Sequence, residues 1–441
     1  MRVVVLGGGS TGEHFVGALR RLDADCEITL VESRLVGGEC SYWACMPTKT
    51  MLRATELVGA ARHAPGVAIP EVDVERVFWW RDQVVDERDD SRQIEWLASQ
   101  RAEFVRGRGL VRDPGLVEVD GQELPYDRLV IATGSVPVIP TIRGLDAIEY
   151  WTNEGATETT EVPASLAVLG GGAVGCELAQ FFARVGARVT LIQTAPRLLP
   201  RVDADAGAIV ERVFAEDGID VRLGAAVTSV DPGVRLTLED GETLEAERLL
   251  LAAGRRPFAD GLGLEQLGVT IGRRGIEVDD RLAAAEGVYA IGDCTGVAQF
   301  THVGKYQARV AAANIAGGEA HADYRAIPAS IFTDPQVASV GRTDGDGVVS
   351  ATWSLAATPR SATYERPRRE GFLKLAADPA RRVLVGAVAV GPEGGEWLQQ
   401  LTLAIRAEVP LDVLLDTIQP YPTFSEAVFF AARELDAALR R

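Results

Sequence analysis

Lysine is almost absent from this sequence. Of the 45 basic residues, only Lys49, Lys305 and Lys374 are lysines, and arginine supplies all the others. Such a bias is typical of a GC-rich coding sequence. A lysine that persists in such a chain is more often chemically required than one in a lysine-rich chain, which singles out Lys49.

Histidine and cysteine are also scarce. The four histidines lack the close spacing of zinc ligands, and the five cysteines are too few and too scattered for a secreted disulfide scaffold. No apolar run approaches the length of about 18 residues that a membrane helix needs. No signal peptide precedes the first predicted strand, so we expect a cytoplasmic protein with no membrane partner.

Positive charge is in deficit, because 63 acidic residues leave a net charge of −18. A surface this acidic repels phosphate backbones, which excludes nucleic acid as an expected partner. With 441 residues, 47% of them hydrophobic, the chain is long enough for two to four domains with sizeable cores. Short repeats and low-complexity linkers are absent.

A complete dinucleotide-binding pattern opens the chain. Residues 2–7 read as a buried strand, and a helix over 13–22 leads to a second strand over 27–32. The turn between the first strand and the helix carries Gly7, Gly9 and Gly12, and the second strand ends at Glu32. The glycines allow close approach to a pyrophosphate at a helix start, and the acid bonds a ribose diol.

The same pattern recurs later in the chain. A strand over 166–169 runs into Gly170, Gly172 and Gly175, and a helix over 177–183 precedes a strand over 187–192. One dehydrogenase needs a single dinucleotide site. Two sites therefore favour a flavin together with a nicotinamide.

Further segments complete the predicted organisation. Two similar strand-to-turn segments close the nucleotide domains, one with Thr133 and Gly134 and the other with Gly254, and another strand ends at Asp293. A helical period rich in charge and tryptophan covers 71–107. From about residue 326 the pattern indicates an α+β domain. Its predicted strands are 331–340, 371–376 and 383–390, and its predicted helices are 395–407 and 424–439.

Two cysteines close to Gly38 carry the most specific signal. Cys40 and Cys45 lie in Gly-Gly-Glu-Cys-Ser-Tyr-Trp-Ala-Cys-Met-Pro-Thr-Lys, soon after the first glycine turn. A flavin stacked on a dithiol can pass two electrons from a nicotinamide to a sulfur substrate. Two buried structural cysteines, or a zinc site, are the alternatives that these residues leave open.

Taken together, these motifs resemble the pyridine-nucleotide-disulfide oxidoreductases, which include dihydrolipoamide dehydrogenase, glutathione reductase and mercuric reductase. The resemblance covers nearly the whole chain, and the runs 292–300 and 332–341 are most similar to the mercuric reductase branch. It implies an α/β fold with two Rossmann-like domains and a C-terminal α+β dimerisation domain. The expected divisions are an FAD domain over 1–148, an NAD(P)H domain over 149–280, a central segment over 281–325 that completes the FAD domain, and a homodimer interface over 326–441.

The resemblance also implies roles for single residues. Cys45 would be the thiolate beside the flavin and Cys40 the exposed interchange thiol. A disulfide needs Cα atoms about 4.4–6.8 Å apart, so Cys40 should lie in a distorted turn before a regular helix. A helix start would stabilise the thiolate. Lys49 would pair with Glu177 near the flavin, and Asp293 would hold its ribityl chain.

The chain departs from the family pattern near its C-terminus. Most relatives have His-Pro followed by Glu, whereas this sequence has Tyr421 and Glu426 at those positions. Only roughly 0.1% of an unperturbed tyrosine is phenolate at pH 7, so Tyr421 is a poor general base. Mercuric reductases also carry tyrosine here, but this chain lacks their terminal cysteine pair.

The nicotinamide site departs from the pattern as well. Gln193 ends the second strand where NAD-preferring relatives have Glu, so the choice between NADH and NADPH stays open. We expect FAD-dependent reduction of a disulfide, of a small thiol-reactive molecule or of a soft metal. The alternatives are a mercuric reductase, a dihydrolipoamide dehydrogenase-type subunit and a quinone reductase that needs only the flavin.

Overall fold

The computed structural model describes residues 1–364 and 371–441 and has an α/β fold. The chain divides into two compact units. The first unit comprises residues 1–47, 79–138 and 254–323, and the second comprises 48–78, 139–253 and 324–441. Helices α3 (Cys45–Arg62) and α4 (Val74–Val84) each begin in one unit and end in the other.

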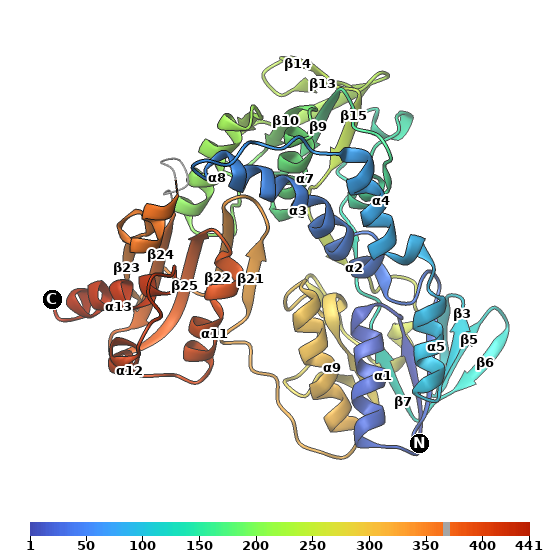
Figure 1. Cartoon of the computed structure of the whole chain (residues 1–441). Coiled ribbons are helices and arrows are strands. Elements are labelled where there is room, and N and C mark those ends of the chain that lie inside the picture. Colours follow the sequence, from blue (N-terminus) through green and yellow to red (C-terminus); the bar gives the residue numbers. More distant parts are fainter. Residues whose placement is uncertain (365–370) are drawn as a thin grey trace. The chain divides into compact units, whose positions relative to one another are not determined.

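The first unit is built on a six-stranded sheet in the order β19-β20-β7-β1-β2-β3, parallel except for β19. Its strands are Ala283–Ala285, Val288–Ala290, Arg128–Ile131, Arg2–Leu6, Glu27–Glu32 and Ala102–Arg106. Side chains of β1 alternate between two cores. Val3 and Val5 pack beneath α1 (Ser10–Leu22) and α9 (Thr301–Ile315), which lie side by side (Figure 1). Val4 and Leu6 face the opposite core.

Smaller elements cover that opposite face and the edges of the first unit. An antiparallel sheet of β4 (Gly109–Asp113), β5 (Leu116–Val119) and β6 (Gln122–Pro125) contributes to the second core. Helix α5 (Ser91–Ser99) packs on β3. Two short pairs join β8 (Ser135–Pro137) to β16 (Arg255–Pro257), and β17 (Ile271–Gly272) to β18 (Gly275–Ile276).

The second unit contains a parallel sheet in the order β11-β10-β9-β15. Its strands are Asp220–Leu223, Arg188–Gln193, Ser165–Leu169 and Arg248–Leu251. Helices α7 (Ala173–Arg184) and α8 (Ala204–Glu216) share one core with Leu166 and Val168. The other face packs on the antiparallel strands β12 (Val227–Asp231), β13 (Arg235–Leu238) and β14 (Thr243–Glu245). Helix α6 (Asn153–Glu158) precedes β9.

The C-terminal part of the second unit is an antiparallel sheet in the order β21-β22-β25-β24-β23. Its strands are Pro328–Ile331, Gln336–Gly341, Val383–Gly391, Phe372–Asp378 and Val349–Ser354. Helices α11 (Gln399–Arg406), α12 (Leu411–Asp416) and α13 (Glu426–Leu439) cover one face, where Ala387 and Ala389 contribute to the core (Figure 1). The short α10 (Gly394–Trp397) precedes them.

Most predicted elements are confirmed, and three are wrong in part. The strand predicted to end at Asp293 is β20, which ends at Ala290, and Asp293 lies in the 3-10 helix Gly292–Thr295. The strand predicted over 27–32 is β2. The strand predicted over 331–340 is interrupted, because β21 ends at Ile331 and β22 begins only at Gln336. The helical segment predicted over 71–107 ends in a strand, β3. Among the described residues, no helix combines the length and the apolar character needed to span a membrane.

Candidate functional site

Cys40 and Cys45 lie on two different helices. Cys40 is the third residue of the short α2 (Gly38–Tyr42), and Cys45 is the first residue of α3. The backbone breaks between them at Trp43, with φ −136° and ψ −2°. The sequence predicts a distorted turn at Cys40 itself, whereas Cys40 lies in α2 and the distortion follows it, at Trp43. Both cysteines are free thiols in this structure.

The two sulfurs share a hydrogen bond, and this bond is the largest of the effects that lower the pKa of Cys40 to about 6. Burial opposes the shift, while hydrogen bonds from Thr301 and Ser10 and the charge of Lys305 add to it. The lowered value belongs to Cys40, whereas the family role of thiolate falls on Cys45. Because two hydrogen-bonded thiols titrate as a pair, the negative charge near neutral pH is a property of both sulfurs.

The start of α9 faces this pair. Thr301 is the first residue of the helix, and its Oγ1 lies 3.6 Å from Cys45 Sγ. Lys305 follows one turn later on the same helix. A helix N-terminus, a hydroxyl donor and a nearby cation all stabilise a thiolate, so this end of α9 favours ionisation of the dithiol.

The first glycine turn forms a cradle for a dinucleotide. A Cβ at Gly7 would lie 2.3 Å from Ala132 O, and one at Gly12 would lie 2.0 Å from Gly7 O. Glu32 stands at the end of β2, where its Oε2 accepts the Gly8 amide at 2.7 Å. Gly9, just before α1, lies against Gly38, where a Cβ would be 2.6 Å from the Gly9 Cα. Only glycine fits these close approaches, which is the requirement of a turn that presents its backbone to a pyrophosphate.

A partly buried polar chain links the cysteine segment to Asp293. Arg255 Nη1 donates to Glu39 Oε1 at 2.7 Å, its Nη2 donates to Glu39 Oε2, and its Nε donates to Ser135 Oγ at 2.9 Å. Ser135 in turn donates to Asp293 at 2.7 Å. Burial is the main cause that raises the pKa of Asp293, with Ser135 and Arg255 opposing it. A buried carboxyl beside the glycine cradle fits the hydroxyl-bearing ribityl chain of FAD.

The predicted turn residues of the first unit lie between these groups. Gly134 has φ +73° and directly precedes β8, and Thr133 donates its hydroxyl to the Phe258 carbonyl. Gly254 has φ +116° and accepts the Val138 amide at 2.9 Å. Gly134 leads into β8 and Gly254 into β16, and the pairing of these two strands places Ser135 beside Arg255.

The other three cysteines are core residues. Cys26, Cys176 and Cys294 are at most 3% exposed. Burial raises the pKa of Cys294 to about 12 and raises the pKa of Cys176 further. A buried neutral thiol is a poor nucleophile, which leaves Cys40 and Cys45 as the reactive pair.

The predicted Lys49–Glu177 pair forms in the second unit. Lys49 Nζ donates to Glu177 Oε2 at 2.7 Å, and the Glu177 side chain is only 4% exposed. Glu177 Oε1 also accepts the Phe332 amide at 2.8 Å. Lys49 lies one helical turn after Cys45 on α3, and the ion pair holds this part of α3 against α7 within the second unit.

The second glycine turn repeats the geometry of the first. A Cβ at Gly170 would lie 2.2 Å from Ala252 O, and one at Gly175 would lie 1.9 Å from Gly170 O, whereas Gly172 is open. Gln193 ends β10, and its Oε1 accepts the Gly171 amide at 3.3 Å, as Glu32 accepts the Gly8 amide. This turn therefore fits the pyrophosphate of a second dinucleotide.

Tyr421 lies in the loop before α13, and Glu426 is the first residue of that helix. Tyr421 is 74% exposed, and Glu426 accepts the Thr423 amide at 3.3 Å. The nearby Ile418 is 94% exposed. An exposed aromatic and an exposed aliphatic side chain together are typical of a surface that a second subunit covers.

Sequence reasoning missed several residues of the site. Arg255 lies in the Gly-Arg-Arg-Pro segment that the sequence marks as a strand-to-turn copy, but nothing in that segment distinguishes it from Arg256. Ser10, Thr301 and Glu39 are equally undistinguished. The sequence predicts no helix directly after residue 300, so the position of Thr301 at the start of α9 emerges only from the structure.

Comparisons with known proteins agree with this geometry. The family model for pyridine nucleotide-disulphide oxidoreductases matches residues 1–316, and the model for their dimerisation domain matches residues 327–432. The dihydrolipoyl dehydrogenase of Thermus scotoductus is 34% identical, with 98% of this chain and 97% of that protein covered. The mercuric reductase of Shigella flexneri is 35% identical, with 100% and 82% covered.

Solved structures share the fold across the whole chain. LpdA of Mycobacterium tuberculosis superposes with a TM-score of 0.88 at 27% identity, covering 99% of each chain. A Cu(II) complex of the flavoprotein disulfide reductase RclA of Escherichia coli gives 0.85 at 26% identity, covering 97% of this chain and 98% of that one. Over its whole length, then, the chain belongs to the pyridine nucleotide-disulphide oxidoreductases, flavin-dependent enzymes that use FAD and NAD(P)H.

Proposed function

We propose that this enzyme uses NAD(P)H to reduce a disulfide or another soft electrophile through the dithiol of Cys40 and Cys45. The observation that carries the proposal is the hydrogen-bonded thiol pair at the start of α9, in which the pKa of Cys40 is lowered to about 6. Because the thiolate is the nucleophile in thiol–disulfide exchange, such a pair reacts at neutral pH.

In this proposal, Gly7, Gly12, Glu32 and Asp293 hold FAD, and Gly170, Gly172, Gly175 and Gln193 hold the nicotinamide dinucleotide. FAD, when bound, supplies two-electron transfer between NAD(P)H and the dithiol. Residues 1–148 and 281–325 form the FAD domain, residues 149–280 the NAD(P)H domain, and residues 326–441 the interface of a homodimer. The match to a dimerisation-domain model supports the last assignment.

The thiol steps follow ordinary exchange chemistry. The Cys40 thiolate attacks one sulfur of the substrate disulfide, which forms a mixed disulfide and releases the first substrate thiolate. Cys45 then loses its proton and attacks Cys40 Sγ, which closes the Cys40–Cys45 disulfide and releases the second substrate thiolate. The two released thiolates take up protons, and the substrate has gained the two electrons of the dithiol.

The proton donor for these thiolates distinguishes this chain from most relatives. The family position of the acid/base histidine holds Tyr421, whose hydroxyl is a hydrogen-bond donor and a weak acid. We propose that the Tyr421 side chain reaches the dithiol of the partner subunit in the homodimer. Its exposure of 74% in the single chain agrees with such a role.

Reduction of a soft metal ion is the second candidate, and Tyr421 favours it. Relatives of this chain include mercuric reductases, and RclA has been solved as a Cu(II) complex. Thiolates are the ligands that soft metals prefer, so Cys40 and Cys45 would bind Hg²⁺ together. Two electrons from NAD(P)H would then convert Hg²⁺ to the metal atom. Among the described residues, Cys40 and Cys45 are the one thiol pair available for the metal, because the other three cysteines are buried, so this function stands second.

An anaerobic titration of the purified flavoprotein with NADH, and separately with NADPH, tests the first proposal. We expect a long-wavelength absorbance band from a thiolate beside the flavin once two electrons have entered. Bleaching of the flavin without that band would contradict the proposal. A Cys45→Ser variant that kept full turnover with quinones or dyes would instead indicate a reductase that needs only the flavin.

A substrate panel with Tyr421 variants separates the two candidates. Lipoamide, glutathione disulfide and Hg²⁺ would be compared in wild type, Tyr421→Phe and Tyr421→His, with Tyr150→Phe as a control. If metal reduction is the function, Tyr421→Phe abolishes mercury turnover and leaves flavin reduction by NAD(P)H intact. If disulfide reduction is the function, Tyr421→His raises disulfide turnover at neutral pH. Co-purification with a 2-oxo acid dehydrogenase complex would instead support a dihydrolipoamide dehydrogenase-type subunit.

A further inference from the structure

One face of helix α7 is polar although it is buried. Glu177, Gln180 and Arg184 are spaced three and four residues apart, which places them on the same side of the helix. Glu177 and Gln180 are 3% and 1% exposed, and the Arg184 side chain is 5% exposed. The neighbouring Leu178 and Phe182 are fully buried in the apolar core. Buried polar groups are costly unless each is bonded, so the partners of this face explain its presence.

The Gln180 side chain holds the segment between β21 and β22 by bonding the backbone of that segment. Its Oε1 accepts the Asp334 amide at 2.7 Å, and its Nε2 donates to the Asp334 carbonyl at 3.0 Å. The same Nε2 donates to Asp217 Oδ2 at 2.9 Å. This amide therefore ties the turn at Asp334 to the residue that caps the end of α8.

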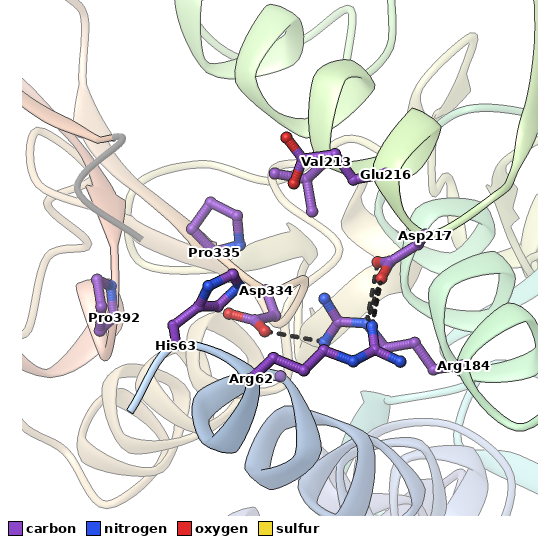
Figure 2. A pocket seen from close by; sticks show the side chains of 10 residues that line it. Arg62, His63, Arg184, Val213, Glu216, Asp217, Asp334, Pro335 and Pro392 are labelled. Carbon is purple, nitrogen blue, oxygen red and sulfur yellow. Dashed lines mark hydrogen bonds and ion pairs between the residues drawn. The ribbon is translucent and has the colours of Figure 1, made fainter. Parts of the chain in front are cut away.

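Arg184 joins three further elements with one guanidinium group. Its Nε donates to both Asp217 oxygens, at 3.0 and 2.9 Å, and its Nη1 donates to Asp334 Oδ2 at 2.8 Å (Figure 2). Nη1 also donates to the Thr55 carbonyl of α3 at 3.3 Å. The planar guanidinium group has several N–H donors in fixed directions and can bond Asp217, Asp334 and Thr55 at once, whereas the single ammonium group of a lysine cannot.

Helix α3 lies directly against this ion pair. A Cβ at Gly59 would be 2.2 Å from Asp334 Oδ2 and 2.8 Å from Arg184 Nη1. Beyond Gly59, a cavity of about 180 Å³ is lined by His63, Arg184 and Asp334, among others (Figure 2). The hydrogen bond from Arg184 to the Thr55 carbonyl and the close approach at Gly59 hold this stretch of α3 beside α7 and Asp334.

These contacts converge on Lys49. Glu177 accepts both Lys49 Nζ and the Phe332 amide, and Phe332 lies two residues before Asp334. The Lys49 ammonium also stands over the Phe332 ring, 4.9 Å from its centroid. A shift of the Phe332–Asp334 turn would therefore move the backbone donor of Glu177 and the aromatic partner of Lys49 together.

We propose that Gln180 and Arg184 are positioning residues, which hold the Phe332–Asp334 turn and thereby fix the Lys49–Glu177 pair on the helix that carries Cys45. The importance of Lys49 for electron transfer rests on the proposed function. The positioning itself is a property of the second unit and is measured without turnover.

The scarcity of lysine provides the readout. The chain has three lysines, so the rate at which an amine reagent acylates Lys49 is measured by mass spectrometry against Lys305 and Lys374. Lys374 is paired with Asp203 at 2.6 Å and serves as the ion-paired reference. The reagent attacks the amine of Lys49 only when the amine leaves Glu177, so the rate reports how firmly the pair is held.

The main experiment compares wild type with Gln180→Met in the FAD-loaded protein. This variant keeps the volume and removes the three hydrogen bonds of the amide. We expect acylation of Lys49 to rise roughly fivefold, in keeping with lost hydrogen bonds, while Lys305 and Lys374 change less than about twofold. The exposed Gln122→Met variant is the matched control and leaves all three rates unchanged. An unchanged Lys49 rate in folded Gln180→Met overturns the proposal.

A second variant covers the case in which Gln180→Met does not fold. Arg184→Lys keeps the charge but cannot reach Asp217, Asp334 and Thr55 together, so Lys49 acylation should again rise, by roughly threefold or more. A Lys49 rate equal to that of wild type would overturn the proposal. A wild-type protein without the thiolate–flavin band would contradict the proposed function only, because the labelling experiment does not depend on it.

Discussion

Thr301 Oγ1 lies 3.6 Å from Cys45 Sγ and begins the helix that also carries Lys305. This single contact connects the start of α9 to the reactive sulfur pair. It gives the dithiol a donor that does not depend on a second subunit.

Replacing Thr301 with valine should weaken the acidity of the dithiol. The variant loses the hydroxyl that helps to lower the pKa of Cys40, so that pKa should rise toward its ordinary value of 9.0. A rise by one unit would slow alkylation of the reduced enzyme by iodoacetamide roughly fivefold at pH 6. A Thr363→Val variant, on an exposed turn, is the control. Equal rates for Thr301→Val and wild type would contradict this role.

The stability of the reduced protein should depend on pH through Cys40. Its pKa is about 6 in the folded protein and 9.0 in its ordinary state, so folding favours the thiolate. The resulting stabilisation is complete above pH 9 and is lost as the pH falls through 6. Thermal unfolding of reduced wild type and Cys40→Ser should therefore differ most at alkaline pH and converge below pH 6. A difference that grows toward acid pH would refute the assignment.

Arg255 and its neighbour Arg256 form a natural pair of variants. Arg255 bonds Glu39 and Ser135, whereas Arg256 bonds the exposed Asp260. Arg255→Met removes the cation that opposes the raised pKa of Asp293, so the carboxylate that would hold FAD becomes less ionised. We expect FAD affinity to fall by roughly tenfold, measured by flavin fluorescence after ultrafiltration. Arg256→Met should retain FAD, and equal losses in both variants would exclude a specific role for Arg255.

The choice of nicotinamide should respond to Gln193. Its amide stands where Glu32 stands in the first glycine turn, and Gln193→Glu would place a charge beside the 2′-position of the ribose. The introduced carboxylate would repel the negatively charged 2′-phosphate of NADPH, so the ratio of kcat/KM for NADH over NADPH should rise roughly tenfold or more. Arg197→Ala should leave this ratio unchanged, because the Arg197 guanidinium donates to the Val202 and Pro200 carbonyls at 2.6 and 2.8 Å. A strong loss of NADPH use in Arg197→Ala would reverse that reading.

Local patterns predicted much of the fold, because they depend on neighbours in the chain. The run Glu-Ile-Thr-Leu-Val-Glu is β2 at the predicted bounds, and the glycine turns have the close approaches that their spacing indicates. The strand predicted over 331–340 is interrupted at Thr333 and Asp334. The Thr333 hydroxyl bonds the Pro335 carbonyl and the Asp334 amide bonds Gln180 of α7, so both groups bond partners other than a neighbouring strand. Apolar residues on both sides of the turn concealed it.

The candidate site shows the same limit. Cys40, Cys45 and the Lys49–Glu177 pair were predicted from motifs. The chain of contacts from Glu39 through Arg255 and Ser135 to Asp293 joins residues up to 216 positions apart. No periodicity carries information over such separations. The adjacent Arg255 and Arg256 are the same residue type, and only the fold directs the first toward Ser135 and the second toward Asp260.

Gly59 has a consequence for how this sequence can evolve. Any side chain there would collide with the carboxylate of Asp334 and the guanidinium of Arg184. A lineage that loses the arginine gains space for a larger residue at position 59 but leaves two carboxylates facing each other. Substitutions at positions 59, 184, 217 and 334 should therefore be correlated among homologous sequences, and a variant that changes one of them alone should be rare.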